Sequence, residues 1–290
     1  MNQVRHRYIT VDGFDIFYRE SGPPQAPTIL LLHGSPSSSI QYRNLFPMLS
    51  DQWRLIAPDL PSFGLSATPD RASYIYSFEN LATTIKRFLD SLSLDIRVLY
   101  LHDYGAQIGF RLLSRRAVRP DALIIQNSEA YYSEGRTKVW ANAEEYWRDP
   151  SDTNREKRRA AFLNEENIRR EFLEDLSTDI CELIDPLVVR LAWDQLGRPG
   201  VAEARLDLHL DYQSNVEHYQ KIQAYFREYQ PPTLVLWGRE DQYYSPEAAD
   251  AYQQDLPSVQ VQVLDGGHWV IETHSDQIAM LTNKFIGGRL

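Results

Sequence analysis

Residues 97–113 constrain the fold of this chain more than any other part of the sequence. Residues 97–101 (Arg-Val-Leu-Tyr-Leu) form an apolar, β-branched run typical of a buried strand, whereas residues 107–113 repeat apolar side chains at helical spacing. Asp103 stands where this strand turns into the helix, and Gly105 follows two positions later. A tight turn of this kind needs a residue without a Cβ near its tip. The pattern predicts a carboxylate at the tip, acting as a nucleophile or as a helix N-cap.

Strands and helices alternate along much of the chain. A hairpin is predicted over residues 8–18, because Asp-Gly separates two stretches of alternating apolar residues. Further strand-like runs occur at 28–32, 54–59, 122–125, 233–238 and 259–264. A helical stripe of apolar side chains lies between Phe78 and Leu92, and another ends the chain. This alternation predicts an α/β fold with a mostly parallel sheet flanked by helices.

Residues 128–230 differ from the rest of the chain. Charged residues crowd together there, the apolar runs shorten, and helical patterns persist without a convincing strand. We therefore expect a core made of residues 1–127 and 231–290, with residues 128–230 inserted as a helical cap. Such an insertion would lie over the carboxyl ends of the strands, where open α/β sheets bind ligands, and would leave a cleft for a small molecule.

Composition excludes several classes of protein. The formal net charge of -10 argues against a nucleic-acid partner, which requires clustered Lys and Arg. Cys181 is the sole cysteine of the sequence, so an internal disulfide and a cysteine metal site are excluded. No apolar segment approaches the ~20 residues needed to cross a bilayer. We expect a cytoplasmic protein without a membrane partner, and the oligomeric state stays open.

Three residues that suit hydrolytic chemistry each follow a predicted strand. They are Asp103, Asp241 and His268, which would meet at one edge of a parallel sheet. His268 could accept a proton from water while Asp241 orients its imidazole. Glu240 is the alternative orienting acid, but the shorter aspartate closes the turn after the strand more readily. His274 is the alternative base, although its place at the start of the last helix favours a surface or capping role.

A second pair of positions would supply backbone N–H groups for an oxyanion. One is Tyr104, directly after Asp103, and the other is Ser35, in the loop after the strand at 28–32. His33 and His102 stand beside these positions. We expect both histidines to support the backbone rather than to act as bases.

Five ordered motifs carry a resemblance to a known family. They are His33-Gly34-Ser35-Pro36, Ala57-Pro58-Asp59-Leu60 with Gly64 and Ser66, His102-Asp103-Tyr104-Gly105, Trp237-Gly238 with Asp241, and Gly267-His268. The set resembles the α/β-hydrolase superfamily, in which nucleophile, acid and base follow one another in this order. More narrowly, it is similar to the branch with an aspartate nucleophile, which contains epoxide hydrolases and haloalkane dehalogenases. The resemblance implies the α/β-hydrolase fold with an inserted helical cap and no cofactor.

An aspartate nucleophile favours a particular electrophile. A carboxylate can displace a leaving group at saturated carbon and leave an alkyl ester on the enzyme. Water activated by His268 would then attack the carboxyl carbon of Asp103, with the oxyanion site stabilising the tetrahedral intermediate. Ordinary esterase chemistry is less favoured.

Epoxide opening produces an alkoxide, which profits from a proton donor in the cap. In epoxide hydrolases a cap tyrosine serves this purpose and is followed by a short stretch that contains Arg and Asn. Residues 211–215 (Asp-Tyr-Gln-Ser-Asn) look similar, and they make Tyr212 the candidate donor. The family usually supplies two cap tyrosines, and Tyr146 is the candidate near the other position. Packing within the cap is the alternative role for both.

Dehalogenation instead needs N–H donors for the departing halide. The resembling dehalogenases place Trp directly after the nucleophile and often Asn in the oxyanion loop, whereas this sequence has Tyr104 and Ser35. An indole from Trp140, Trp147 or Trp193 in the cap could substitute, although core packing is the commoner role of tryptophan.

The sequence therefore predicts a hydrolase that opens a small or medium, mostly apolar epoxide to a diol. A haloalkane or haloacid dehalogenase is the first alternative. A hydrolase of esters or lactones and a non-catalytic receptor built on the same scaffold are the others.

Overall fold

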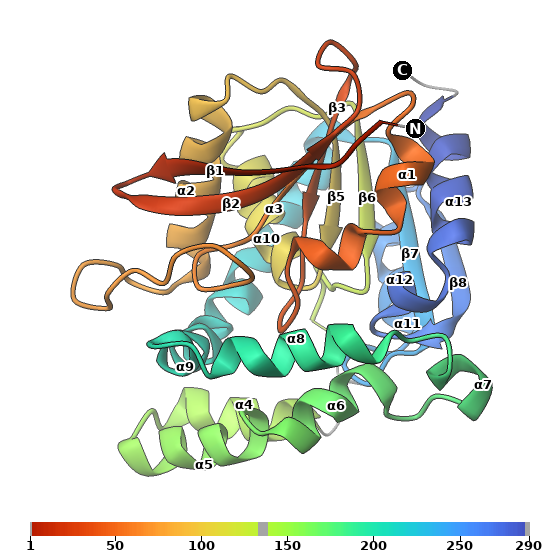
Figure 1. Cartoon of the computed structure of the whole chain (residues 1–290). Coiled ribbons are helices and arrows are strands. Elements are labelled where there is room, and N and C mark those ends of the chain that lie inside the picture. The colour runs from red at the N-terminus through yellow and green to blue at the C-terminus, as the bar shows by residue number, and fades with distance from the viewer. Residues whose placement is uncertain (1, 133–138, 288–290) are drawn as a thin grey trace.

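A computed structural model describes residues 2–132 and 139–287, and within these ranges eight strands form one sheet (Figure 1). The strands are β1 (Arg5–Val11), β2 (Phe14–Ser21), β3 (Thr28–Leu32), β4 (Arg54–Pro58), β5 (Ile96–His102), β6 (Ala122–Gln126), β7 (Thr233–Glu240) and β8 (Gln260–Gly267). Their spatial order is β1-β2-β4-β3-β5-β6-β7-β8. β2 runs antiparallel to both neighbours, and every other pairing from β4 to β8 is parallel. The expected α/β-hydrolase sheet is confirmed.

Helices cover both faces of the sheet (Figure 1). One face carries α2 (Phe78–Ser91), α3 (Tyr104–Ser114) and α10 (Gln213–Tyr229), and the other carries α1 (Leu45–Leu49) and α13 (Ser275–Gly287). The remaining short helices of these parts of the chain are η1 (Ser39–Tyr42), α11 (Glu247–Asp250), η2 (Ala251–Gln254) and α12 (Val270–Thr273).

The central strands are apolar along their whole length because both of their faces are buried. In β3, Leu30 and Leu32 pack under α2 and α3, whereas Ile29 and Leu31 pack under α1 and α13. All four side chains are fully buried. A strand covered on one face would instead alternate apolar and polar residues, so the continuous apolar run at 28–32 reflects a sheet with two covered faces.

The chain between β6 and β7 is helical throughout its described part. Its helices are α4 (Val139–Arg148), α5 (Asp152–Phe162), α6 (Glu165–Leu173), α7 (Thr178–Cys181), α8 (Pro186–Leu196), α9 (Val201–Asp211) and α10. α10 packs against α3, so it belongs spatially with the sheet. α6 and α8 share a small apolar cluster that also receives Trp269 from the loop after β8. The helices α4 to α9 lie beneath the sheet in Figure 1.

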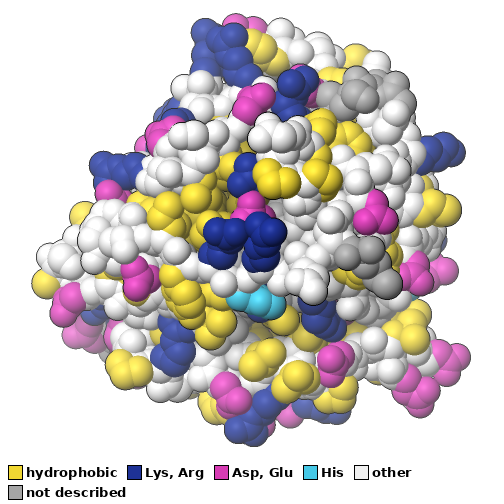
Figure 2. Space-filling view, turned by 45° about the horizontal axis from the view of Figure 1, so that its top comes forward, with side chains coloured by type: hydrophobic (Ala, Val, Ile, Leu, Met, Phe, Trp, Pro, Cys, Tyr) yellow, Lys and Arg dark blue, Asp and Glu magenta, His cyan; other side chains and the backbone are white. Residues whose placement is uncertain are grey.

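The surface combines charges of both signs. On the face drawn in Figure 2, Lys and Arg side chains are interspersed with Asp and Glu and with apolar patches. Ion pairs of the described surface include Arg87 with Asp12 and Lys86 with Asp90. Within the described ranges, every helix is too short or too polar to cross a bilayer.

Candidate active site

Asp103 occupies the tip of a sharp turn between β5 and α3. Its backbone has φ 49° and ψ -118°, a conformation that costs a residue with a Cβ about 1–3 kcal/mol. The turn requires Gly105, because a Cβ there would lie 2.1 Å from the backbone oxygen of Leu32. Asp103 holds the N-cap position of α3, yet its side chain makes no capping hydrogen bond. The carboxylate of Asp103 therefore does not serve as the N-cap acceptor of α3.

The carboxylate of Asp103 is held by backbone N–H groups. The N–H of Ser35 donates to Oδ1 over 2.7 Å, and the N–H of Tyr104 also donates to this side chain. Gly34 permits the close approach, because a Cβ there would lie 2.8 Å from the Cβ of Asp103. The structure thus brings together the two predicted oxyanion donors and leaves Oδ2 on the opposite side, toward His268.

His268 lies between two aspartates. Its Nδ1 is 2.9 Å from Oδ2 of Asp241, and its Nε2 is 3.8 Å from Oδ2 of Asp103, which is longer than a hydrogen bond. The side chain of Asn127 donates to the same oxygen of Asp241 over 2.7 Å. The backbone N–H groups of residues 243 and 244 donate to the other oxygen, Oδ1. Asp241 is therefore fixed by four donors and fixes the imidazole in turn.

The alternative acid and base lie elsewhere. Glu240 is exposed, and its backbone belongs to the pairing of β7 with β8. His274 lies 2.8 Å from the hydroxyl of Thr273, just before α13. Asp241 and His268 are therefore the residues that the fold brings to Asp103.

His33 and His102 both support the loops around Asp103. Nδ1 of His33 donates to the carbonyl of Gly34, and Nε2 accepts from the N–H of Leu60. Nε2 of His102 donates to the carbonyl of His268 over 3.2 Å. Burial lowers the pKa of His33 to about 3 and holds the pKa of His102 well below its usual value. Both imidazoles are therefore neutral supports of the backbone.

The environment shifts the pKa values of nucleophile and base in the same direction. Burial raises the pKa of Asp103, while the charge of His268 and the two backbone donors oppose the rise. For His268, burial alone would lower the pKa. The charge and hydrogen bond of Asp241, together with the charge of Asp103, outweigh burial and raise it. The two groups therefore stabilise each other's charges in the resting state.

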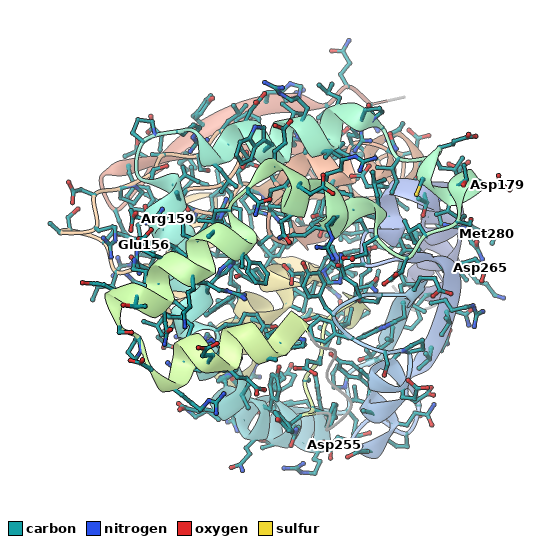
Figure 3. The ribbon with its side chains drawn as sticks, turned by 90° about the horizontal axis from the view of Figure 1, so that it is seen from below. Glu156, Arg159, Asp179, Asp255, Asp265 and Met280 are labelled. Carbon is teal, nitrogen blue, oxygen red and sulfur yellow. The ribbon has the colours of Figure 1, made fainter. Side chains whose placement is uncertain are left out.

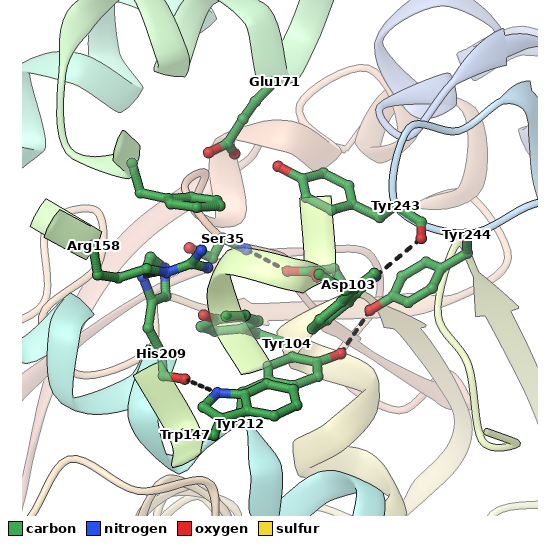
Figure 4. A pocket seen from close by; sticks show the side chains of 13 residues that line it. Ser35, Asp103, Tyr104, Trp147, Arg158, Glu171, His209, Tyr212, Tyr243 and Tyr244 are labelled. Carbon is green, nitrogen blue, oxygen red and sulfur yellow. Dashed lines mark hydrogen bonds between the residues drawn. The ribbon is translucent and has the colours of Figure 1, made fainter. Parts of the chain in front are cut away.

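A cavity of about 60 Å³ opens above Asp103 (Figure 4). One water needs roughly 10–15 Å³ on the same measure, so the cavity suits a molecule of a few heavy atoms. Its walls combine aromatic and polar side chains from the core and from the inserted helices. The lining residues are Ser35, Asp103, Tyr104, Trp140, Ala143, Trp147, Arg158, Phe162, Glu171, His209, Tyr212, Tyr243 and Tyr244.

The two predicted proton donors have different surroundings. Tyr212 lines the cavity, and its hydroxyl lies 2.6 Å from that of Tyr244 (Figure 4). Tyr146 does not line this cavity, and its buried hydroxyl accepts a hydrogen bond from Arg155 over 3.0 Å. The structure therefore pairs Tyr212 with Tyr244 and leaves Tyr146 within the packing of α4 against α5.

The tryptophans of the cavity use their indole N–H groups within the protein. Trp140 donates to the carbonyl of Tyr243 over 3.0 Å, and Trp147 donates to the carbonyl of His209 over 2.8 Å. Trp193 borders a separate hollow near α8. The indoles considered as halide donors are thus engaged or remote from Asp103.

Sequence patterns did not identify several residues of the site. Tyr244 directly follows the turn that contains Asp241. Its position close to Asp241 in the sequence was the available sign that it belongs to the site. Glu171 in α6 and Arg158 in α5 carried no signal beyond being charged residues on helices. Burial raises the pKa of Glu171 to about 8, and the charge of Asp103 adds to the rise, whereas His268, Arg158 and a hydrogen bond from Tyr243 oppose it.

The site contains no obvious position for a metal. Among residues 2–132 and 139–287, no three His, Cys, Asp or Glu side chains converge in a way that could hold an ion.

Comparison with known proteins identifies the family of this fold. The model of the alpha/beta hydrolase fold family matches residues 27–275. The chain belongs to the α/β-hydrolase family. Among its α/β-hydrolase relatives, an uncharacterized hydrolase from Saccharomyces cerevisiae is 36% identical over 284 residues, which cover 94% of each chain.

Two further α/β-hydrolases represent the two predicted chemistries. A haloalkane dehalogenase from Bradyrhizobium diazoefficiens is 36% identical over 114 residues, or 39% of this chain and 36% of that protein. The solved structure of the epoxide hydrolase CorEH superposes with a TM-score of 0.78 and 18% identity, covering 99% of each chain. The second likeness concerns the fold alone. The family match supports a hydrolase, and neither of these two proteins decides between the two substrates.

Proposed function

We propose that this α/β-hydrolase opens epoxides to diols through an alkyl ester on Asp103. The observation that carries the proposal is the pair of hydroxyls of Tyr212 and Tyr244, 2.6 Å apart, in the same cavity as the carboxylate. An epoxide oxygen leaves as an alkoxide attached to its own substrate, and it needs a proton where the bond breaks. In this proposal the helices α4 to α9, within the predicted cap at residues 128–230, cover the site, and the donor Tyr212 directly follows α9, while α10 packs with the sheet.

In the first step, Oδ2 of Asp103 attacks a ring carbon while Oδ1 keeps the hydrogen bond from the N–H of Ser35. A carbon–oxygen bond forms to the enzyme, and the ring carbon–oxygen bond breaks. The alkoxide takes the proton of Tyr212, whose developing phenolate accepts a hydrogen bond from Tyr244. The product of this step is a hydroxyalkyl ester.

In the second step, His268 takes a proton from water, and the hydroxide attacks the carboxyl carbon of Asp103. The oxyanion forms at the position of Oδ1, to which the N–H of Ser35 already donates, and the N–H of Tyr104 contacts the same carboxyl group. Esterification has removed the charge of Asp103, one of the causes that raise the pKa of His268. The imidazolium therefore loses its proton more readily, and the neutral imidazole that must act as a base is available. The tetrahedral intermediate then collapses: the bond between the carboxyl carbon and the ester oxygen breaks, the departing diol oxygen takes the proton of the added hydroxyl, and Asp103 is again a carboxylate. The imidazolium of His268 returns its proton to the phenolate of Tyr212.

Dehalogenation receives less support from the same cavity. A departing halide needs N–H donors near the nucleophile, and the indoles of Trp140 and Trp147 already donate to backbone carbonyls. The dehalogenase relative keeps this reaction as the second candidate.

A panel of small substrates tests the proposal. The purified protein is incubated with glycidamide, with a bromoalkane of similar size and with an aryl ester, and diol, halide and acid are measured separately. We expect diol formation that depends on Asp103, so that Asp103→Asn abolishes it. Halide release without diol would select the dehalogenase, and acid release would select the esterase. Saturable binding without turnover would point to a receptor.

A further inference from the structure

Arg158 is a buried cation on the wall of the active-site cavity. The residue lies in α5 and is 7% exposed. Its Nε lies 3.3 Å from Nδ1 of His209, and its guanidinium covers the ring of Phe162. Its Nη1 is buried and has no hydrogen-bond partner within the described part of the chain. Burial lowers the pKa of Arg158 to about 10, so the side chain is charged at neutral pH.

The carboxylates around α5 are engaged with other cations. Glu145, which borders the hollow behind Arg158, pairs with Lys157 over 3.2 Å. Glu203 pairs with Arg155 and Arg159 of the same helix. Within residues 2–132 and 139–287, no carboxylate lies within ion-pair distance of Arg158.

Glu171 is the acidic side chain that shares the cavity wall with Arg158. It is hydrogen-bonded to Tyr243, and its raised pKa of about 8 keeps the carboxyl largely neutral at pH 7. Glu171 and Arg158 both reach the cavity beside Asp103 (Figure 4). The two side chains form no ion pair in the described structure, and the largely neutral carboxyl leaves most of the guanidinium charge uncompensated.

A second buried guanidinium lies close by. Arg205 in α9 is fully buried and donates to the hydroxyl and the carbonyl of Ser62, without a carboxylate partner in the described structure. Two unpaired guanidinium groups in the interior of an acidic protein are costly unless an anion compensates them. Of these two arginines, Arg158 lines the cavity and Arg205 does not. Arg158 therefore places a positive charge on the cavity wall.

We infer that the substrate carries a carboxylate and that Arg158 binds it while Asp103 attacks the reacting carbon. The inference rests on the proposed function, which it extends to a class of substrate, the small epoxy acids. A guanidinium presents donors in a fork that matches a carboxylate, and Nη1 makes no hydrogen bond to the described protein. The small cavity and its aromatic walls leave room for a short carbon skeleton between the two groups.

A matched pair of substrates tests the inference. Glycidate and glycidamide share one skeleton and differ in the charge of the acyl group. We expect kcat/KM to favour glycidate in the natural protein and Arg158→Gln to lower this preference about 10- to 100-fold, the range for a charged hydrogen-bonded contact. Arg158→Lys should retain part of the preference, because it keeps the charge without the fork. Equal use of both substrates by the natural protein would overturn the inference.

Arg159→Gln is the matched control. This residue belongs to the same helix but pairs with Glu156 and Glu203 away from the cavity (Figure 3). The control should leave the preference unchanged. Thermal unfolding of each variant identifies any general loss of folding, and a preference that falls equally in Arg159→Gln would also overturn the inference.

Equilibrium binding separates this inference from the proposed reaction. Propionate and propionamide are titrated calorimetrically into the natural protein and into Arg158→Gln. Binding of propionate that requires Arg158, without turnover of any epoxide, would uphold the carboxylate subsite and reject epoxide hydrolysis. Hydrolysis of glycidamide without measurable binding of propionate would reject the subsite and uphold the reaction.

Discussion

Replacing Asp241 by asparagine should separate the two chemical steps. Asp241 accepts four hydrogen bonds, from Asn127, His268 and two backbone N–H groups. An asparagine can keep the two backbone donors on its oxygen. Its amide nitrogen then faces Asn127, whose Oδ1 has no partner in the described structure and can turn to accept. His268 can accept from the new amide only by moving its proton from Nδ1 to Nε2, the atom that must take a proton from water.

The size of the effect follows from the distance between the two groups. At 2.9 Å and an effective dielectric constant of about 20, a carboxylate attracts an imidazolium by about 6 kcal/mol. This energy corresponds to roughly four powers of ten in rate. Ester hydrolysis should therefore slow by about 10³- to 10⁴-fold in Asp241→Asn. Alkylation of Asp103 transfers no proton through His268 and should change far less.

Rapid quenching with mass spectrometry provides the assay. In a single turnover with glycidamide, Asp241→Asn should form the ester on Asp103 and retain it, whereas the natural protein should release diol. Glu240→Gln is the control, because this neighbouring carboxylate is exposed and should leave both steps unchanged. Diol release by Asp241→Asn within tenfold of the natural rate would refute the assigned role of Asp241.

Three further perturbations test other parts of the site. Tyr212→Phe should slow epoxide opening by about 10²-fold or more, measured as diol formation, while Tyr146→Phe, outside the cavity, should not. Glu171 loses its proton near pH 8, which adds a negative charge to the cavity. The KM for glycidate should therefore rise as the pH passes about 8. Glu171→Gln should abolish that rise. Gly105→Ala should lower the free energy of unfolding by about 3 kcal/mol in urea titrations, because its Cβ would lie 2.1 Å from a carbonyl oxygen. Gly197→Ala, with its nearest contact at 3.5 Å, should be nearly neutral, and equal losses in both would contradict the argument.

The sheet and the core of the site were predictable because they depend on local signals. An apolar run bounded by turn residues marks a strand buried on both faces, as in β3, where the predicted and observed residues coincide at Thr28–Leu32. In a parallel sheet the residues after the strands meet at one edge. The expectation that Asp103, Asp241 and His268 lie together therefore followed from their positions directly after parallel strands.

The inserted helices were less predictable because their packing is not local. Periodicity identifies a helix but gives neither its direction nor the neighbour against which its faces lie. The sequence therefore could not show that Tyr146 faces Arg155 while Tyr244 from the core reaches Tyr212. It also could not show that Arg158, among several arginines of α5, is the one that lines the cavity.

The attack of Asp103 on the substrate is the central claim, and an isotope experiment tests it most directly. An excess of the protein is mixed with glycidamide in water labelled with heavy oxygen, so that each molecule turns over once. If Asp103 forms an ester that water attacks at the carboxyl carbon, the first diol is unlabelled and the Asp103 peptide gains one heavy oxygen. A labelled diol with an unlabelled peptide would mean that water attacks the substrate directly, and it would contradict the account.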